Sequence, residues 1–280
     1  MTEPLKIGVL KLGCIGNLPL IEFLLDERAE RTDIDVRVSG SGAKLGTKQC
    51  TEATKQLLEQ NPDLVILVGP AQATPGPTEA RRMIAASKTR AIVVSDSPAK
   101  KFVKEFEDAG LGYVVVEADS MIGARREFLD PAEMAAYNSD VLKVLAETGA
   151  LNVVVEGIDR TIESLKAGKK PELPKVVVDA STATEAAGFT NPYAKAKASA
   201  AYETACQVAR ITAEACFKVQ DHNVYVPMVA AAHEMMRAAA RLVDEAREIE
   251  KSGDTVCRKS HFTNGARGIK KKLMEKPTRV

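Results

Sequence analysis

The chain has 280 residues, enough for one large domain or two smaller ones, and nearly half of them are apolar. Its 39 basic and 38 acidic residues leave a net charge of +1, without the basic excess that is typical of a general nucleic-acid-binding protein. Aromatic residues make up only 4% of the chain and Trp is absent, so we expect a closely packed aliphatic core.

Neither the N-terminus nor the cysteines indicate secretion. Residues 1–13 lack the basic flank and the long apolar centre of a signal peptide. No apolar stretch approaches the roughly 20 residues that span a bilayer. The five cysteines form no C-x-x-C pair, and an odd number suits free thiols in a reducing compartment. We therefore expect a cytoplasmic protein with no membrane partner.

The first two thirds of the chain alternate short apolar runs with amphipathic segments. The expected strands are Lys6–Leu10, Ile34–Val38, Leu64–Val68, Ala91–Val94 and Tyr113–Val116, with Val153–Val155 and Val176–Val178 as later candidates. The expected helices are Leu18–Glu30, Thr47–Gln60, Thr78–Ser87, Ala99–Ala109 and Pro131–Thr148. This alternation, with β-branched runs as strands, predicts an α/β fold with an open, doubly wound, mainly parallel sheet.

The pattern changes from about Pro192, where two long Ala-rich segments, Ala194–Phe217 and Pro227–Lys251, predict helices. No strand pattern follows, and we expect the basic stretch Arg258–Val280 to be a solvated tail. We predict an α/β ligand-binding domain over residues 1–184. Residues 185–280 are then an attached C-terminal helical bundle that serves oligomerisation and carries the basic tail.

Small residues follow each of the first five expected strands. In open α/β sheets, ligands bind outside the carboxyl ends of the strands. Glycine allows a ligand to approach the backbone, and the N-terminus of the next helix offers free N–H groups to anions. A ligand-binding cleft is therefore expected along this edge. Its candidate residues are Gly13, Cys14, Ile15, Gly16, Gly40, Ser41, Gly69, Pro70, Ala71, Gln72, Ser95 and Asp96.

The loops do not match the G-x-G-x-x-G fingerprint of dinucleotide-binding proteins cleanly. The first loop has only Gly13 and Gly16, and the second has Gly40, Gly42 and Gly46, one residue too long and after the second strand. No G-x-x-x-x-G-K-[ST] loop is present either. A nicotinamide dinucleotide in the usual pose is possible but not favoured.

Metal-dependent and covalent chemistry receive little support. The three histidines lack metal-ligand spacing, and the G-x-S-x-G elbow of serine hydrolases is absent. Cys14 precedes an expected helix start, where the pKa of a thiol falls. No histidine lies near it in the sequence, so we interpret Cys14 as part of a pocket wall. We expect no metal site.

Charged residues gather just after the fifth strand. Arg125 and Arg126 could bind a carboxylate or phosphate, or they could belong to a salt-bridged helix surface. Asp119 has a better claim to a functional role, since it lies nearer the strand end.

Several segments resemble one enzyme family. They are KIGVLKLGCIGNLPLIEFLLDERAER, VGPAQATPGP, SDSPAKK, EADSMIGARREFLDPAEMAAYNSDVLKVLAETGA and NPYAKAKASAAYETA. These segments are similar to the coenzyme F-420-dependent methylenetetrahydromethanopterin dehydrogenases of methanogenic archaea, and the similarity runs essentially from end to end.

The resemblance implies a reversible one-carbon step of methanogenesis from CO2. A hydride passes between methylene-tetrahydromethanopterin and C5 of the deazaflavin, and methenyl-tetrahydromethanopterin forms. Coenzyme F-420 is then a dissociable co-substrate, and neither a metal nor a bound flavin is expected. The resemblance also implies a homo-oligomer, a homohexamer in the best-known members.

The resemblance also suggests roles for the candidate site residues. A carboxylate near the methenyl cation favours its positive charge as it develops, and we predict Asp119 for this role, with Asp96 and Glu117 as rivals. The strand-end residues named above are expected to bind coenzyme F-420. Basic groups such as Lys11 and Lys44 would join them at the phosphate and carboxylate tails. The expected pterin-binding residues are Glu117, Ser120, Met121, Arg125 and Arg126.

Two alternative functions stay open at this point. One is a nicotinamide-dependent dehydrogenase of a reduced pterin or folate. The other is a non-catalytic small-molecule sensor with a helical dimerisation module.

Overall fold

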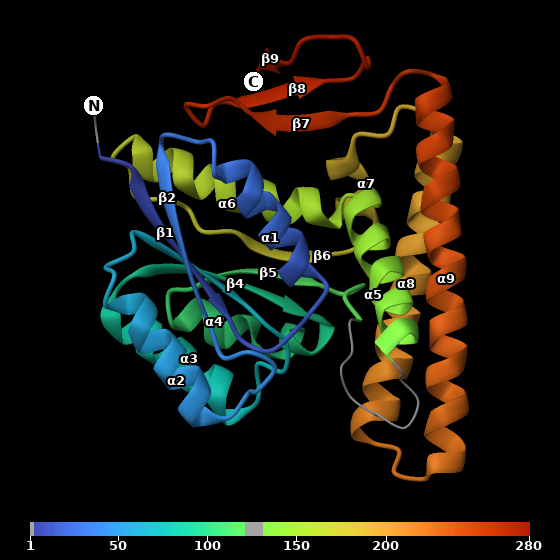
Figure 1. Ribbon diagram of the computed structural model, residues 1–280, viewed down its shortest axis with the longest axis horizontal. Coiled ribbons are helices and arrows are strands. Elements are labelled where there is room, and N and C mark those ends of the chain that lie inside the picture. The colour runs from blue at the N-terminus through green and yellow to red at the C-terminus, as the bar shows by residue number, and fades with distance from the viewer. Residues whose placement is uncertain (1–2, 121–130) are drawn as a thin grey trace.

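The computed structural model describes residues 3–120 and 131–280, and Figure 1 shows three parts: a sheet covered by helices, a pair of long helices, and a small C-terminal sheet. The main sheet is parallel throughout, in the order β2-β1-β3-β4-β5-β6. Its strands are β1 (Leu5–Lys11), β2 (Ile34–Gly40), β3 (Leu64–Val68), β4 (Arg90–Asp96), β5 (Gly112–Val116) and β6 (Lys175–Val178).

Helices cover both faces of this sheet (Figure 1), which confirms the predicted doubly wound α/β class. Strands β3 and β5 are buried along their whole length, as their unbroken apolar sequences predict. One face carries α1 (Asn17–Arg28) and α6 (Ala150–Lys166). The other carries α2 (Thr47–Leu58), α3 (Pro75–Ser87) and, after the 3-10 turn η1 (Ser97–Phe102), the short α4 (Val103–Asp108).

The prediction of a strand at Val153–Val155 is wrong, because these residues lie within α6. The reason is visible in the apolar spacing. Ala150, Val154, Ile158 and Ile162 recur every four residues and are all buried, which is the stripe of an amphipathic helix.

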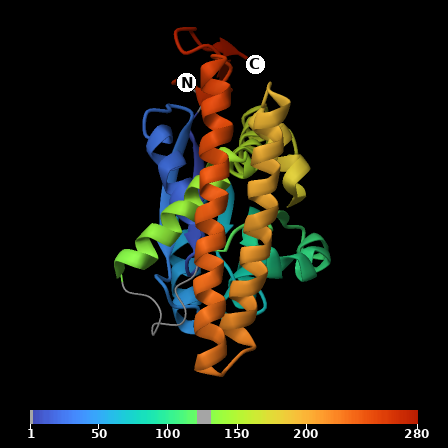
Figure 2. The ribbon, with the colours of Figure 1, turned by 90° about the vertical axis from the view of Figure 1, so that its right-hand side faces the viewer.

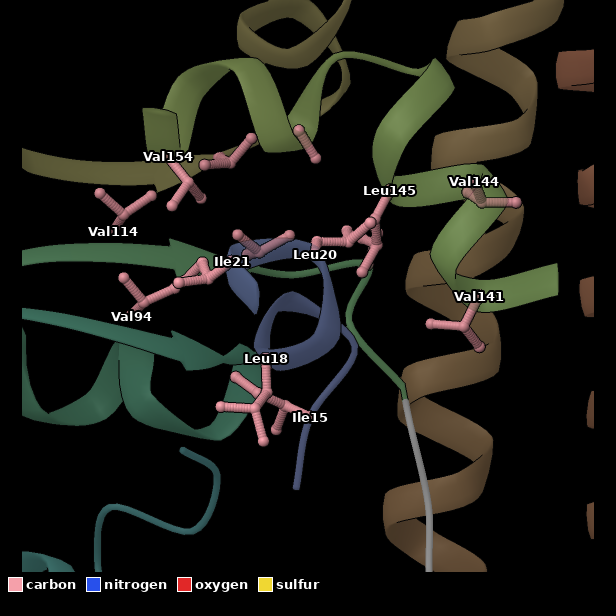
Figure 3. Close-up of a cluster of buried hydrophobic side chains, with 14 of the residues drawn as sticks. Ile15, Leu18, Leu20, Ile21, Val94, Val114, Val141, Val144, Leu145 and Val154 are labelled. Atoms are coloured by element: carbon pink, nitrogen blue, oxygen red, sulfur yellow. The ribbon is translucent and has the colours of Figure 1, made fainter. Parts of the chain in front are cut away.

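Helix α5 (Pro131–Glu147) joins the sheet domain to the long helices. It packs against α1 on one side and against α8 (Pro192–Phe217) and α9 (His222–Ser252) on the other. Figure 3 shows Leu20 and Ile21 of α1 between Val94 of the sheet and Leu145 of α5. The core is therefore continuous from the sheet to the long helices.

Helices α8 and α9 lie side by side along most of their length (Figure 2). Their contact surfaces are rich in buried alanine, and small side chains allow two helices to approach closely. The Asn191 side chain caps α8 by accepting hydrogen bonds from the backbone N–H groups of Tyr193 and Ala194, with Pro192 in the first helical position.

Helix α9 begins earlier than its predicted start at Pro227. The Asp221 side chain accepts a hydrogen bond from the Asn223 N–H at 2.9 Å and starts the helix at His222. Pro227 then lies in the second turn of the helix, where it removes the N–H that would otherwise bond the Asn223 carbonyl. The short α7 (Ala180–Ala187) precedes α8.

The expectation of a solvated C-terminal tail is wrong. Residues 258–279 contain β7 (Arg258–His261), β8 (Arg267–Lys270) and β9 (Thr278–Arg279), which form an antiparallel sheet. Figure 1 shows this sheet above α1 and α6. Its basic strands lack an apolar alternation, so the sequence pattern could not reveal them. Contacts with distant residues hold them in place.

The central contact of the C-terminal sheet is a buried charge cluster around Asp159 of α6. His261 Nε2 lies 2.7 Å from one oxygen of the Asp159 carboxylate. The other oxygen accepts a hydrogen bond from Arg28 at 3.4 Å and lies 3.8 Å from Arg31. All four side chains are at most 5% exposed. Charges so deeply buried require their partners.

A second carboxylate, Asp33, extends this cluster. Arg31 donates two hydrogen bonds to it, and Lys166 donates a third at 2.8 Å. Burial alone would raise the pKa of Asp33, but the hydrogen bonds from Arg31 and Lys166 lower it to about 2. The cluster thereby ties α1, α6, the start of β2 and the C-terminal sheet together.

Among the described residues, no helix is long and apolar enough to cross a membrane.

Replacing Asp159 with Asn leaves Arg28 and Arg31 buried without their shared counter-charge, so we expect the free energy of unfolding to fall by about 3–5 kcal/mol. The matched control is Glu163→Gln on the same helix, which removes a more exposed ion pair with Arg267 of β8 and costs at most about 1 kcal/mol. Urea denaturation followed by circular dichroism measures both. Equal losses in the two variants would contradict the importance of the cluster.

Candidate active site

The order of the strands creates a topological switch point at the carboxyl edge of the main sheet, and we call the space outside it the crevice. The chain leaves β1 for β2 on one side and returns to β3 on the other, so the loops after β1 and β3 turn in opposite directions. Ligands of doubly wound sheets bind at such a switch point. Contacts join the loop after β1 to Asp119, just past β5, and the loop after β3 to Ser95 at the end of β4.

Asp119 fixes the loop after β1 from the far side of the crevice. Its carboxylate accepts hydrogen bonds from the backbone N–H groups of Gly16 at 2.7 Å and Asn17 at 2.8 Å, and from the Asn17 side chain at 2.7 Å. The carboxylate therefore satisfies the free N–H groups at the start of α1. Asp119 is only 4% exposed.

Close packing explains the glycine at position 16. A Cβ atom there would lie 2.9 Å from an Asp119 oxygen, 2.7 Å from Leu145 and 3.0 Å from Val141. The two apolar residues come from α5, so the loop after β1 is held between the end of β5 and this helix. Gly13, with φ +71°, provides the turn that begins the loop.

The loop after β3 is organised around the Gly69 carbonyl oxygen. It accepts hydrogen bonds from the Gln72 side chain at 2.8 Å and from the Ser95 hydroxyl at 2.7 Å. Arg81 in turn donates to the Gln72 backbone carbonyl at 2.7 Å and to its side-chain oxygen at 2.9 Å. Gln72 and Ser95 are buried, so they support the loop from beneath.

Asp96 ends β4 and is partly exposed at the crevice. Its burial and the nearby charge of Asp119 raise its pKa to about 7. A carboxyl group with such a pKa can hold or release a proton near neutral pH. It is the strongest acid–base candidate among the predicted strand-end residues.

Several of the predicted charged groups already have partners. Glu117 forms a 3.0 Å ion pair with Lys100, and Lys11 pairs with Glu22. Lys44 is exposed on the loop after β2.

The loop after β2 reaches the loop after β1. The Ser41 hydroxyl accepts a hydrogen bond from the Gly13 N–H at 3.3 Å, and the Ser41 N–H donates to the Lys11 carbonyl at 2.9 Å. Gly40 lies at the exposed end of β2. Ser41 and Gly40 therefore border the crevice on its β2 side.

The expected fall in the pKa of the Cys14 thiol is wrong. Cys14 is exposed, but partial desolvation and the charges of Asp119 and Glu22 raise its pKa. A protonated thiol suits the predicted role in a pocket wall.

The sequence pattern did not reveal that Tyr137 of α5 contacts Ser120, or that His233 of α9 stacks on Tyr137. The Tyr137 hydroxyl donates to the Ser120 carbonyl at 2.9 Å and lies 2.9 Å from its hydroxyl. His233 stacks on the Tyr137 ring with centroids 4.1 Å apart and an angle of 17°. The available signal was a polar aromatic residue on the apolar face of each helix. The predicted substrate residues Met121, Arg125 and Arg126 lie outside the described residues.

The predicted residues divide by exposure into two sets. The loop tips carry Cys14, Gly40, Ser41, Pro70, Ala71, Asp96 and Glu117, which are at least partly exposed. The buried set contains Gly13, Ile15, Gly16, Gly69, Gln72, Ser95, Asp119 and Ser120.

The part of the chain that the structure describes contains no group of three or more His, Cys, Asp or Glu residues placed to hold a metal ion.

The sheet order and the small-residue loops at the strand ends define a doubly wound α/β protein, a fold class in which ligands bind at the switch point. The chain belongs to the methylene-5,6,7,8-tetrahydromethanopterin dehydrogenase family, whose model matches residues 5–278. This confirms the resemblance stated from the sequence.

Curated relatives agree over almost the whole chain. The F-420-dependent methylenetetrahydromethanopterin dehydrogenase of Archaeoglobus fulgidus is 56% identical, covering 97% of this chain and 98% of the relative. The enzyme of the same name from Methanothermobacter marburgensis is 54% identical, with coverage of 97% and 99%.

A solved structure has the same fold. It is that of an F-420-dependent methylene-tetrahydromethanopterin dehydrogenase in complex with methylene-tetrahydromethanopterin and coenzyme F-420. It is 46% identical and superimposes with a TM-score of 0.93, covering 98% of this chain and all of the other. These relatives support neither a nicotinamide-dependent enzyme nor a sensor.

The raised pKa of Asp96 predicts a stability that declines with pH. Below about pH 4 the carboxyl is protonated in both states, and as pH rises towards about 7 the unfolded chain releases the proton while the folded protein retains it. We therefore expect the free energy of unfolding to fall over this window. Asp96→Asn should remove this contribution, and its stability relative to wild type should rise between pH 4 and pH 7.

Asp179→Asn is a control of opposite sign. Hydrogen bonds from Thr182 lower the pKa of Asp179, which caps α7 after β6. That variant should lose stability at neutral pH and recover relative to wild type in acid. Urea denaturation at half-unit pH steps measures both variants. An Asp96→Asn profile parallel to wild type would contradict the assignment.

Proposed function

We propose that this protein transfers a hydride reversibly between methylene-tetrahydromethanopterin and coenzyme F-420, forming methenyl-tetrahydromethanopterin. The observation that carries the proposal is the nearly complete match to the solved complex with both compounds, at a TM-score of 0.93. The hydride leaves the methylene carbon with its electron pair, and the deazaflavin takes up this hydride and one proton. The reaction belongs to one-carbon metabolism.

The residues of the crevice fit a flat, dissociable co-substrate. The loop tips consist of small residues, and a Cβ atom at Gly42 would meet no atom within 4 Å, so space is open there. We propose that coenzyme F-420 contacts Cys14, Gly40, Ser41, Pro70, Ala71 and Asp96. The deazaflavin supplies the carbon that accepts the hydride. The buried predicted residues, from Gly13 to Ser95, hold these loops in position.

The proposed role of Asp96 is to exchange a proton at its carboxyl group. Oxidation of the methylene compound consumes one proton as the deazaflavin is reduced, and the reverse reaction releases it. A carboxyl with a pKa of about 7, at the end of β4, can serve both directions at neutral pH.

The proposed role of Asp119 is to position the loops, since hydrogen bonds from Gly16 and Asn17 occupy its carboxylate. Its negative charge also favours the methenyl cation as it develops. Hydride transfer between two carbons depends on orientation, with the carbons about 3–3.5 Å apart. Glu117 and Ser120 are proposed to contribute on the pterin side.

We propose that the α/β part, residues 1–184, binds the ligands and that residues 185–280 support assembly into a homohexamer. Phe217, at the end of α8, is 74% exposed, as expected of an apolar side chain that a second subunit covers. Light scattering tests this: a particle of six times the 30.1 kDa chain supports the hexamer, and a monomer overturns it.

The purified protein should bleach the absorbance of oxidised coenzyme F-420 when methylene-tetrahydromethanopterin is added, without an added metal. Omitting either compound should abolish the change. Replacing coenzyme F-420 with NAD or NADP at equal concentration should give no turnover. Reduction of the nicotinamide instead, or ligand binding without turnover, would overturn the proposal.

Asp119→Asn should lower kcat by roughly 100-fold, because an amide group cannot accept all three hydrogen bonds and carries no charge. The matched control is Asp179→Asn, which also alters a carboxylate cap after a strand but lies at the end of β6. Its kcat should stay within about threefold of wild type. Steady-state kinetics with both compounds varied measures the effect, and full activity of Asp119→Asn would remove Asp119 from the site.

A further inference from the structure

We propose that Tyr137 is a positioning residue for hydride transfer, through which helices α5 and α9 hold Asp119 and Ser120 just past the end of β5. The inference rests on the function proposed above. Tyr137 is placed on α5, outside the strand-end loops, and its hydroxyl reaches the residue that follows Asp119.

Two hydrogen bonds join Tyr137 and Ser120. The Tyr137 hydroxyl donates to the Ser120 carbonyl oxygen at 2.9 Å, so the Ser120 hydroxyl, also at 2.9 Å, donates to Tyr137. Both residues are buried, with Tyr137 at 4% and Ser120 at 5% exposure. Two buried hydrogen bonds fix both the backbone and the side chain of Ser120.

The protonation states of Tyr137 and His233 do not change around neutral pH, so the hydrogen bonds between Tyr137 and Ser120 are kept. Burial raises the pKa of Tyr137, so its hydroxyl stays protonated and continues to donate. Burial lowers the pKa of His233 to about 4, so the stacked imidazole is neutral above that pH. Glu133, Glu234 and Arg237 also face this imidazole, Glu133 at 3.9 Å.

Helix α5 reaches the crevice at two further positions. Val141 and Leu145 follow Tyr137 at intervals of four residues, so all three lie on one face of the helix. These two side chains pack directly against Gly16, whose N–H donates to Asp119. One face of α5 therefore contacts both ends of the Asp119–Gly16 connection.

The Tyr137 ring lies at the edge of a pocket between α5 and α9. This pocket has a volume of about 310 Å³ and is lined by residues that include Tyr137, His233, Asp140 and Arg237. The hydrogen bonds to Ser120 and the stack on His233 hold the ring on its other sides.

The decisive comparison is Tyr137→Phe against Tyr113→Phe. Tyr113 is also buried, and its hydroxyl donates to the Glu107 carboxylate at 3.0 Å, at the start of β5 and away from the strand-end loops. Tyr137→Phe should lower kcat by about 10–100-fold with both KM values within about threefold. Its primary isotope effect with deuterated methylene substrate should rise, because hydride transfer becomes rate-limiting. Tyr113→Phe should change neither quantity by more than about twofold.

The His233 stack provides a second test that does not remove the hydroxyl. His233→Ala should lower kcat and raise the isotope effect as Tyr137→Phe does, and His233→Phe, which restores a stacked ring, should rescue both. This pair keeps the inference testable even if Tyr137→Phe fails to fold.

The outcomes separate the inference from the proposed function. An inactive wild-type enzyme overturns both. An active wild-type enzyme with equal kcat values and isotope effects in the two Tyr→Phe variants overturns the positioning role alone. A loss of melting temperature in Tyr137→Phe with unchanged kcat also overturns it, since Tyr137 would then be structural only.

Discussion

Two backbone N–H groups at the start of α1 depend on a single carboxylate from the other side of the crevice. Gly16 and Asn17 donate to Asp119 within 2.8 Å. A helix start buried without acceptors would cost several kcal/mol. The loop after β1 is therefore fixed to Asp119, just past the end of β5. The same negative charge raises the pKa of Asp96 and of Cys14.

A second electrostatic contact plays a comparable part at the opposite end of the molecule. Asp159 links Arg28, at the end of α1, to His261 in the C-terminal sheet. Helix α1 is thus fixed by a carboxylate at each end: Asp119 at its first residues and Asp159 at its last. Since α1 begins at the crevice, the position of its N-terminus depends on both ends. This explains why a small sheet of basic strands is part of the fold.

Most of the main sheet could be predicted from the sequence, because short β-branched apolar runs favour strands buried on both faces, although Val153–Val155 is such a run and lies in α6. The strand-end loops could also be predicted, because glycine and proline mark them. The sequence did not reveal which residues point into the crevice, since Gln72 and Ser95 turn inward to support the Gly69 carbonyl. Nor could it reveal the His261 or Tyr137 contacts, which join residues far apart in the chain and follow no periodic pattern.

The Asp119–Gly16 bond also has a consequence for how the protein folds. Its partners are 103 residues apart, so the bond closes a loop that contains four of the six parallel strands of the main sheet. Such long-range contacts form slowly, since much of the intervening chain must be ordered before they become favourable. During synthesis, α1 can leave the ribosome well before the residue that caps it. The crevice is therefore among the last features to mature, and the recovery of activity during refolding should lag behind the recovery of helical signal.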